Sequence, residues 1–219
     1  MKNIKINKGL RSKCPKLRLG CLSFSVQYVS ESEALQQQIE TISAEIATVL
    51  QTDEISQLPN LQAARQSYRA LGKAPSRYRL SAEALLRRVV QGKGMYQINP
   101  IVDALNLVSI QTAFSIGGYD LNKIQGDIYL DIGKEDTPYN AIGKGEYNIA
   151  NLPVLNDEKG AFGTPTSDSV RTSVTPSVEN FLMVFFDFDG AANLSATMEQ
   201  TATLYQQFMT IKNIETSIV

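Results

Sequence analysis

The sequence contains no histidine and only two cysteines, and both shortages restrict the chemistry that the protein can perform. Without histidine, Ser–His–Asp and Cys–His catalysis are excluded, and so are nearly all zinc sites. Acid–base chemistry must therefore come from Asp, Glu, Lys, Tyr, a thiol or the substrate itself. We expect neither a cofactor nor a metal ion.

Long apolar runs are also missing, and none approaches the roughly 20 residues that span a bilayer. The N-terminal segment MKNIKINKGL is basic but lacks the apolar centre of a secretory signal. We therefore expect a cytoplasmic protein without a membrane partner, in which Cys14 and Cys21 stay reduced. Basic neighbours can lower the pKa of the Cys14 thiol, but no base that would complete a nucleophilic pair is identifiable.

Hydrophobic residues make up 43% of the 219-residue chain and charged residues 20%, which is ordinary for a globular protein. No linker-like stretch, repeat or low-complexity segment interrupts the chain, so we expect residues 1–219 to form a single domain. Helical patterns come first, short strand-like runs follow, and a helix closes the chain. This order predicts an α+β fold with a mixed sheet or sandwich core and helices packed outside.

The net charge of −1 conceals two basic segments. Residues 1–30 contain seven basic residues and no acid, and residues 65–93 contain eight basic residues and one acid, so the rest of the chain carries a net −15. Such segments either form a phosphate-facing surface or are solvated faces neutralised by acids nearby in the fold. For RNA binding, the candidate contacts are Lys8, Arg11, Arg69, Lys73, Arg77 and Arg79.

Helical spacing and capping residues predict several helices. Ser30 and Glu33 form a capping box that opens one helix, which should end near Leu50. Further helices are expected at 59–71, at 81–90 with Ser81 as the cap, at 100–113 with Asn99 as the cap, and after Asn193.

Strand character appears first in Leu17–Val29. The side on which the apolar residues fall switches at Gly20–Cys21, which suggests a bulge or a bend. Shorter strands are expected at 127–132, 139–142, 147–149 and 153–155, with a hairpin turn at Gly143–Lys144–Gly145. Residues 181–188, FLMVFFDF, are almost continuously apolar and predict a central strand covered on both faces.

Polar groups inside the otherwise apolar stretch Met95–Asp120 are the first candidates for a binding site. Asp103 and Asn106 are three residues apart and therefore share one face of the predicted helix. They either line a cleft or bond to a neighbouring loop backbone. Gly117–Gly118, with Tyr119 beside it, either lets a ligand approach the backbone closely or forms a tight turn.

The segment 163–172, GTPTSDSVRT, is the most unusual stretch, because five hydroxyl side chains, an acid and an arginine follow a glycine. Arg171 offers forked donors for a carboxylate or phosphate, and Asp168 can accept from an ammonium group or a ribose hydroxyl. We therefore consider Asp168 and Arg171 candidate catalytic residues. The candidate substrate-binding residues of the segment are Gly163, Ser167, Ser169 and Thr172. The alternative is a solvated loop.

Three motifs occur in a fixed order: YRxLGKxPSRYR at 68–79, NPxxDxxN at 99–106 with GYDL at 118–121, and FGxPxSDSxRT at 162–172. They resemble the tRNA-binding and editing module of the phenylalanyl-tRNA synthetase beta subunit, which is formed by its third and fourth structural domains. The first and last motifs also resemble free-standing bacterial and archaeal versions of that module. The resemblance covers about residues 65–190, and residues 1–64 match only loosely.

The resemblance implies a layered α+β fold with a cleft for the aminoacyl end of a tRNA, where the synthetase hydrolyses wrongly attached tyrosine. Gly163 matches a glycine of that pocket. Two polar groups are missing, because Gly117 stands where the synthetase has a histidine, and Met183 or Val184 where it has a glutamate. Tyrosine editing therefore does not carry over residue by residue. No aminoacylation domain is expected in the chain, so it should not charge tRNA itself.

Three functions stay open at this point. The first is a hydrolase that acts in trans on mischarged aminoacyl-tRNA, with Asp168 orienting water or the substrate ammonium and Arg171 holding a phosphate or carboxylate. In that reaction, backbone N–H groups near Gly163 and Gly117–Gly118 would stabilise the oxyanion, and a substrate ribose hydroxyl would replace the missing histidine. The second is a non-catalytic RNA or amino-acid binding module, whose affinity for RNA would fall with salt. The third is a small-molecule binding protein unrelated to tRNA.

Overall fold

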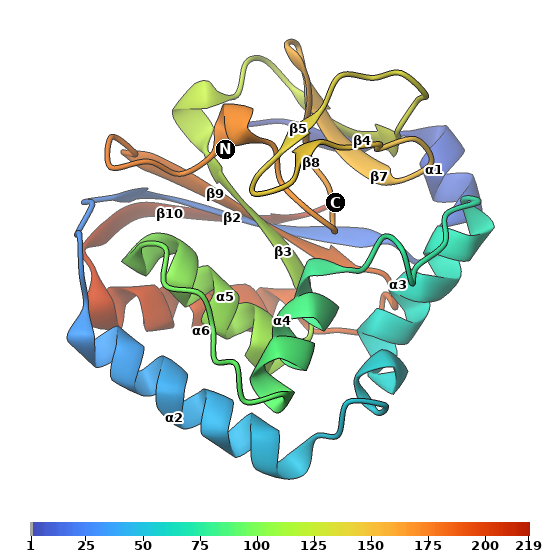
Figure 1. Ribbon diagram of the computed structural model, residues 1–219. Coiled ribbons are helices and arrows are strands. Elements are labelled where there is room, and N and C mark those ends of the chain that lie inside the picture. Colours follow the sequence, from blue (N-terminus) through green and yellow to red (C-terminus); the bar gives the residue numbers. More distant parts are fainter. Residues whose placement is uncertain (1) are drawn as a thin grey trace.

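Two four-stranded sheets stacked on each other form the centre of the fold in the computed structural model, which describes residues 2–219 (Figure 1). The first sheet has the order β1-β4-β7-β8, with bounds Ile4–Ile6, Ile128–Ile132, Pro153–Asp157 and Gly160–Gly163. The second has the order β10-β2-β9-β3, with bounds Ile211–Ile218, Arg18–Val26, Asn180–Asp187 and Ser115–Asp120. β1 pairs with β4 in parallel and the other pairs are antiparallel, so the core contains a mixed sheet.

Helices cover the face of the second sheet that is turned away from the first sheet (Figure 1). α4, α5 and α6 pack directly on that face, and α2 packs on α4 and α5 from outside. The bounds are Lys8–Lys13 for α1, Glu33–Val49 for α2, Pro59–Ala70 for α3, Ser81–Val90 for α4, Pro100–Thr112 for α5 and Leu194–Phe208 for α6. The predicted α+β class, with helices outside a sheet core, is confirmed. Within residues 2–219, no helix has the length and hydrophobicity needed to cross a membrane.

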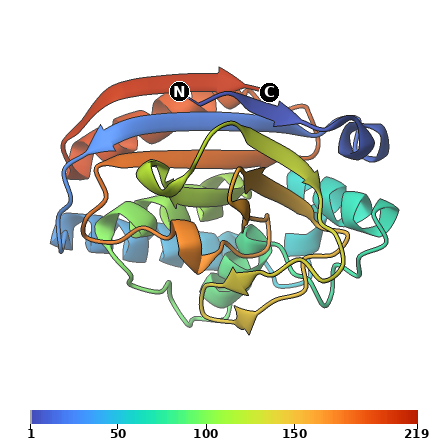
Figure 2. The same ribbon diagram turned by 90° about the horizontal axis from the view of Figure 1, so that it is seen from above.

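β9 is the central long strand because its side chains are buried on both faces. Every residue from Phe181 to Asp187 is buried, and Phe181 packs on the rings of Phe24 and Tyr205 on the helical side. Figure 2 shows β10, β2 and β9 running side by side. The apolar run at 181–188 therefore correctly predicts a strand that is covered on both faces.

β2 runs beside β9 without interruption. Its register with β9 continues from Arg18 through Ser25 without a shift, so of the two alternatives predicted at Gly20–Cys21 the bulge is wrong. The apolar parity changes there because β2 is buried on both faces over most of its length. A Cβ on Gly20 would lie 3.2 Å from the Leu194 side chain, so this glycine lets α6 pack closely on the strand.

α2 to α6 lie where the sequence predicts helices, with differences at two N-termini, whereas α1 was not predicted. Asn99 and Asn193 each accept a backbone N–H of the first turn, as expected of capping residues. The predicted capping box at Ser30 is wrong, because α2 begins after Ser32, whose hydroxyl accepts from the first turn. Ser81 is the first residue of α4 and makes no capping hydrogen bond.

The short strands are predicted less well. β4, β7 and the two-residue β5 (Asn140–Ala141) lie within or overlap predicted runs, and the turn at 142–144 joins β5 to β6 (Gly145–Glu146). Residues 147–149 do not form a strand, because the pairing in this hairpin ends at Glu146. Gly117–Gly118 lies inside β3 and not in a loop or turn. This edge strand is stabilised by pairing with β9, although glycine has low strand propensity.

Candidate functional site

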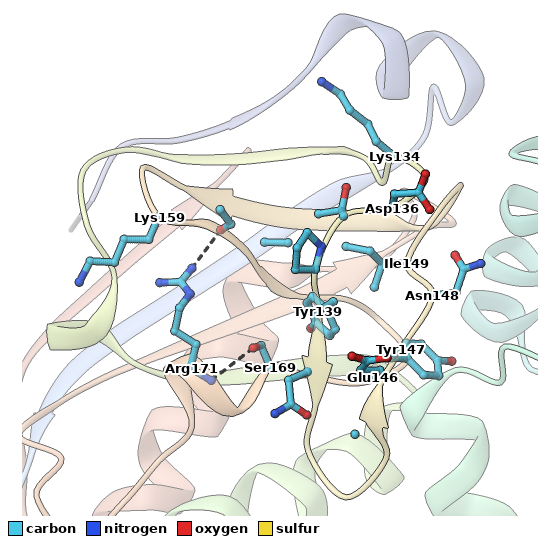
Figure 3. A pocket seen from close by; sticks show the side chains of 16 residues that line it. Lys134, Asp136, Tyr139, Glu146, Tyr147, Asn148, Ile149, Lys159, Ser169 and Arg171 are labelled. Atoms are coloured by element: carbon cyan, nitrogen blue, oxygen red, sulfur yellow. Dashed lines mark hydrogen bonds between the residues drawn. The ribbon is translucent and has the colours of Figure 1, made fainter.

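An open cleft of about 1070 Å³ lies where four segments of the chain meet (Figure 3). Its walls come from residues 134–140 after β4, residues 145–149 in and after β6, residues 159–161 at the start of β8, and residues 169 and 171. These are mainly turns, and the strands of the first sheet hold their ends in place. Turns anchored on a rigid sheet are a common location for binding residues.

Charged side chains of both signs line this cleft (Figure 3). Lys159 lies with Arg171 on one side, and Lys134 lies with Asp136 towards the opposite end. Glu146 lies beside the ring of Tyr147. Because Lys134, Lys159, Asp136 and Glu146 are exposed, they are available to a ligand that carries positive and negative groups.

Tyr147 forms an aromatic part of the cleft wall, and residues outside the cleft hold its ring in place. Its ring packs edge-on against Tyr78, with ring centroids 5.7 Å apart, and the Lys73 ammonium lies 3.8 Å from the Tyr78 centroid. Burial, together with nearby Tyr78, raises the pKa of Tyr147 to about 12. The cleft therefore presents a neutral, immobilised phenol ring at this side.

Arg171 reaches the edge of the cleft, but an ion pair and backbone carbonyls hold its guanidinium. It forms a forked pair with Asp157, at 2.8 Å and 3.1 Å, and also donates to the carbonyls of Gly160 and Lys123. Burial alone would raise the pKa of Asp157, but hydrogen bonds from Arg171 and from the Gln125 N–H outweigh it and lower that pKa. Arg171 therefore stabilises the turn between β7 and β8, which carries Lys159.

Asp168 lies at the free edge of β3, the last strand of the second sheet. Its carboxylate accepts the Tyr119 hydroxyl at 2.7 Å and the Gly118 N–H at 3.3 Å. Part of the residue remains accessible, yet burial of the carboxylate raises its pKa to about 7, against the lowering effect of the hydrogen bonds from Tyr119 and Gly118. Asp168 thus attaches the 163–172 segment to β3 and carries a carboxyl group that titrates near neutral pH.

The side chain of Tyr119 fills the space between Gly117 and Gly163. A Cβ on Gly117 would lie 1.9 Å from the Tyr119 hydroxyl oxygen, and a Cβ on Gly163 would lie 2.2 Å from the same atom. Phe162 packs edge-on against the Tyr119 ring, with centroids 4.9 Å apart. Both glycines therefore accommodate a side chain of the protein itself. Gly118 points to the opposite face, where a Cβ would collide with the Leu105 side chain.

The hydroxyl groups of the 163–172 segment mainly stabilise the segment itself. The Thr164 hydroxyl accepts the Ser167 N–H and donates to the Ser167 carbonyl, and the Ser169 hydroxyl accepts the Arg171 N–H. The Thr172 hydroxyl is buried and, within residues 2–219, has no hydrogen-bond partner. Of the proposed substrate-binding residues in this segment, Ser169 lines the cleft.

Asp103 and Asn106 are not part of this cleft. They lie on α5, which packs on the helical side of the second sheet. Asp103 is buried and accepts hydrogen bonds from the Gln36 side chain and the Ile98 N–H. Burial raises the pKa of Asp103, and these hydrogen bonds only partly oppose the rise. Bonding to a neighbouring loop backbone, the alternative left open by the sequence, describes Asp103 correctly.

The basic residues predicted to bind RNA differ in exposure. Lys73 is buried, and its ammonium lies within hydrogen-bond distance of the Asn148 carbonyl and side-chain oxygen, so it is not part of an exposed basic surface. The exposed ones are Lys8, Arg11, Arg69, Arg77 and Arg79. Basic neighbours do not activate the Cys14 thiol, because burial raises its pKa more than Ser67 and Lys13 lower it.

Sequence reasoning missed most of the side chains that line the cleft. Lys134 and Asp136 belong to the short charged run 134–136, Lys159 ends the run 157–159, and Glu146 lies near a turn, so none follows a helical or strand periodicity. The predicted turn at 143–145 indicates a hairpin in this region. It does not indicate that the side chains beside the turn face a cleft. Within residues 2–219, no group of three or more metal-binding side chains is arranged to hold a metal ion.

Comparison with known proteins gives one family match. The model of the B3/4 domain family matches residues 63–208, about two thirds of the chain. A solved structure, the N-terminal fragment of the phenylalanyl-tRNA synthetase beta subunit from Pyrococcus horikoshii, is similar with a TM-score of 0.48 and 13% identity. The similarity covers 99% of this chain and 50% of that fragment, so the chain spans half of the fragment's length. No curated protein matches.

Proposed function

The chain belongs to the B3/4 domain family, and from this premise we propose that it binds tRNA with the 3′ aminoacyl end in the cleft of Figure 3. The observation that carries the proposal is the combination of charges in the cleft. An aminoacylated 3′ end is a zwitterion, because the amino acid has a free ammonium group and the nucleotides have phosphates. Lys134 and Lys159 suit the phosphates, and Asp136 and Glu146 suit the ammonium group.

The size and aromatic lining of the cleft also support this ligand. Pockets for small molecules usually have volumes of roughly 300–1,000 Å³, and this cleft of about 1070 Å³ is large enough for a nucleotide with its amino acid. RNA-binding proteins commonly stack unpaired bases on tyrosine rings. Tyr147 is the best placed ring for such stacking, because its position is fixed by Tyr78.

Replacing both lysines of the cleft should weaken tRNA binding. We expect Lys134→Ala/Lys159→Ala to lower the affinity for aminoacylated tRNA about tenfold and to reduce the slope of log Kd against log salt by about 1.4, since each single-stranded phosphate contact contributes about 0.7. Fluorescence anisotropy at several salt concentrations measures both quantities. The matched control is Lys93→Ala/Lys212→Ala, because these exposed lysines do not line the cleft. If aminoacylated and deacylated tRNA bind with equal affinity, the cleft does not bind the aminoacyl group.

A second function, hydrolysis of the aminoacyl ester, is favoured by the position and the pKa of Asp168. Asp168 does not itself line the cleft, but it is partly accessible and directly precedes Ser169, which does line it. A general base works best when its pKa lies near the working pH, and burial brings the pKa of this carboxyl group to about 7. We propose that ionised Asp168 accepts a proton from the attacking water, whose oxygen then forms the new bond to the ester carbonyl carbon. The ribose oxygen leaves with a proton, and the products are free amino acid and uncharged tRNA.

This hydrolysis predicts a specific pH profile. Because the base must be ionised, kcat should rise with pH and level off above about 7, and Asp168→Asn should lower kcat by about 100-fold or more while tRNA affinity changes little. Tyr119→Phe removes a hydrogen bond that lowers this pKa, so the midpoint should move upward. A panel of mischarged tRNAs provides the assay. Deacylation no faster than the spontaneous rate, by folded protein that binds these tRNAs, refutes hydrolysis and leaves binding intact.

A further inference from the structure

α1 is a short helix at the edge of the molecule (Figure 1), and its exposed residues include three cations and no acid. Lys8, Arg11 and Lys13 are exposed, whereas its single large apolar residue, Leu10, is fully buried. The next cation, Lys16, is exposed as well. No acid occurs in residues 1–30. Asp189 lies near Lys13 and Lys16, but within residues 2–219 none of these four cations forms an ion pair with it or with another acid.

Hydrogen bonds connect α1 to the strand that leads into the cleft. Asn7, the residue before α1, donates its backbone N–H to the Leu130 carbonyl at 2.9 Å and its side-chain amide to Asp131 at 2.7 Å. Lys134, at one end of the cleft, follows Asp131 by three residues. α1 also packs against β4, the strand that leads to Lys134. The basic surface of α1 therefore adjoins the Lys134 end of the cleft.

The C-terminal end of α3 lies on the other side of α1. Cys14, directly after α1, lies beside Ser67 of α3, and Arg69 follows in the last turn of α3. Arg69 is exposed. Beyond this helix, the Lys73 side chain contacts Asn148, which lines the cleft. Both α1 and the end of α3 are thus connected to the walls of the cleft. Their exposed cations extend the positively charged surface beyond the cleft.

We propose that α1 and Arg69 bind the phosphate backbone of a double-stranded RNA stem, and that the single-stranded 3′ end of the same RNA continues from there into the cleft. This inference rests on the proposed function, because it assumes that the cleft holds that 3′ end. Lys8, Arg11 and Lys13 provide the contacts on α1. Such contacts fix the position of a stem without reading its sequence, so the surface selects for the shape and charge of a stem next to a free 3′ end.

The burial of Leu10 favours RNA over an anionic membrane. Helices that lie on membranes insert a face of apolar side chains below the headgroups. α1 has no such face, because Leu10 points into the core and its remaining side chains are polar or absent. Its exposed cations can contact a polyanion without inserting into it, which is how proteins bind the phosphates of nucleic-acid backbones.

The test separates the stem contact from the contact with the 3′ end. Lys8→Ala/Arg11→Ala/Lys13→Ala should weaken binding of an aminoacylated tRNA at least tenfold and reduce the salt slope by about 2 to 3, close to 0.9 per duplex phosphate contact. Binding of an aminoacylated CCA trinucleotide should stay unchanged, because it has no stem. Lys134→Ala/Lys159→Ala should weaken both ligands. Lys8→Arg/Lys13→Arg keeps the charge and should bind like the original chain.

The possible results distinguish the stem contact from the proposed function. If the chain binds tRNA and the triple variant binds it equally well, the stem contact is refuted while the proposed function stands. If the chain binds neither tRNA nor the trinucleotide, the proposed function fails and the stem contact fails with it. If the chain binds vesicles containing phosphatidylserine, and the triple variant loses that binding but keeps tRNA binding, α1 contacts a membrane instead. Urea unfolding of the triple variant checks that these exposed substitutions leave the fold intact.

Discussion

Gly117→Ala should lower the free energy of unfolding by about 3 kcal/mol or more, a large part of the roughly 5–15 kcal/mol that stabilises a typical domain. The added methyl group would lie 1.9 Å from the hydroxyl oxygen of Tyr119 and 2.4 Å from its Cζ. These separations are far below van der Waals contact, so either Tyr119 or the β3 backbone must move.

Tyr119 has little freedom to move, which is why we expect a large effect. The residue is fully buried, its ring packs on Phe162, and Gly163 approaches its hydroxyl from the other side. Its hydroxyl also donates to Asp168, a bond that would be lost if the ring were displaced. Losing a buried hydrogen bond in addition to the steric strain accounts for a cost at the upper end of the usual range for overpacking.

A double-mutant cycle with Tyr119→Leu tests this cause. Leucine lacks the two atoms nearest to the added methyl group, so Gly117→Ala should cost much less in that background, although Tyr119→Leu is itself destabilising. Urea unfolding at equilibrium measures all four proteins. Gly9→Ala is the matched control, because no atom lies within 4 Å of a Cβ built there, and its effect should be neutral or slightly stabilising. Equal costs of Gly117→Ala in both backgrounds would show that Tyr119 is not the obstacle.

Gly117 shows how far the sequence predicts the structure around β3. The sequence indicates where the backbone is closely approached, but not by which group. Two adjacent glycines indicate a close approach to the backbone, and a close approach does occur. The sequence does not reveal which group approaches. Here it is the side chain two residues further along the same strand, because residues i and i+2 of a strand lie on one face.

The predictable parts of the fold are those where one local signal dominates. Helices α3, α5 and α6 carry helical spacing with proline or asparagine at their starts, and β9 is a run of large apolar residues. β10 was missed because most of its residues are exposed and polar, and it pairs only along one edge of β2. Its pairing depends on tertiary structure, which no short window of sequence contains.

The cleft was harder to predict than the segment beside it. Asp168 and Arg171 attract notice because acid, arginine and hydroxyls are concentrated in 163–172. In the fold, Asp168 bonds to β3 and Arg171 to Asp157, so much of this polarity stabilises the segment. Lys134 and Lys159 look ordinary in sequence, and only the folding of separate turns brings them to one cleft.

Arg171→Ala should be about as destabilising as the glycine substitution, by about 3 kcal/mol. This is the lower end of the usual cost of removing one partner from a buried ion pair, because the Arg171 side chain is 27% exposed. The Asp157 side chain has no exposed surface and would keep only the backbone N–H groups of Gln125 and Lys159 as donors. Arg171→Lys should recover only part of the loss, because an ammonium group cannot reproduce the forked contact. Urea unfolding at pH 7 gives the magnitudes, and the exposed Arg69→Ala should change stability by less than about 0.5 kcal/mol.

The dependence on pH distinguishes the loss of this ion pair from a general loss of packing. The pKa of Asp157 in the folded protein lies below its ordinary value of 3.8, so its ionisation stabilises the fold above that value, and the contribution disappears as the pH falls through the folded pKa. In Arg171→Ala that pKa should rise, because burial is then opposed only by backbone N–H groups. The stability difference between the two proteins should therefore be largest near neutral pH and shrink below about pH 4. A difference that stays constant over this range would attribute the effect to lost packing of the arginine side chain and not to its charge.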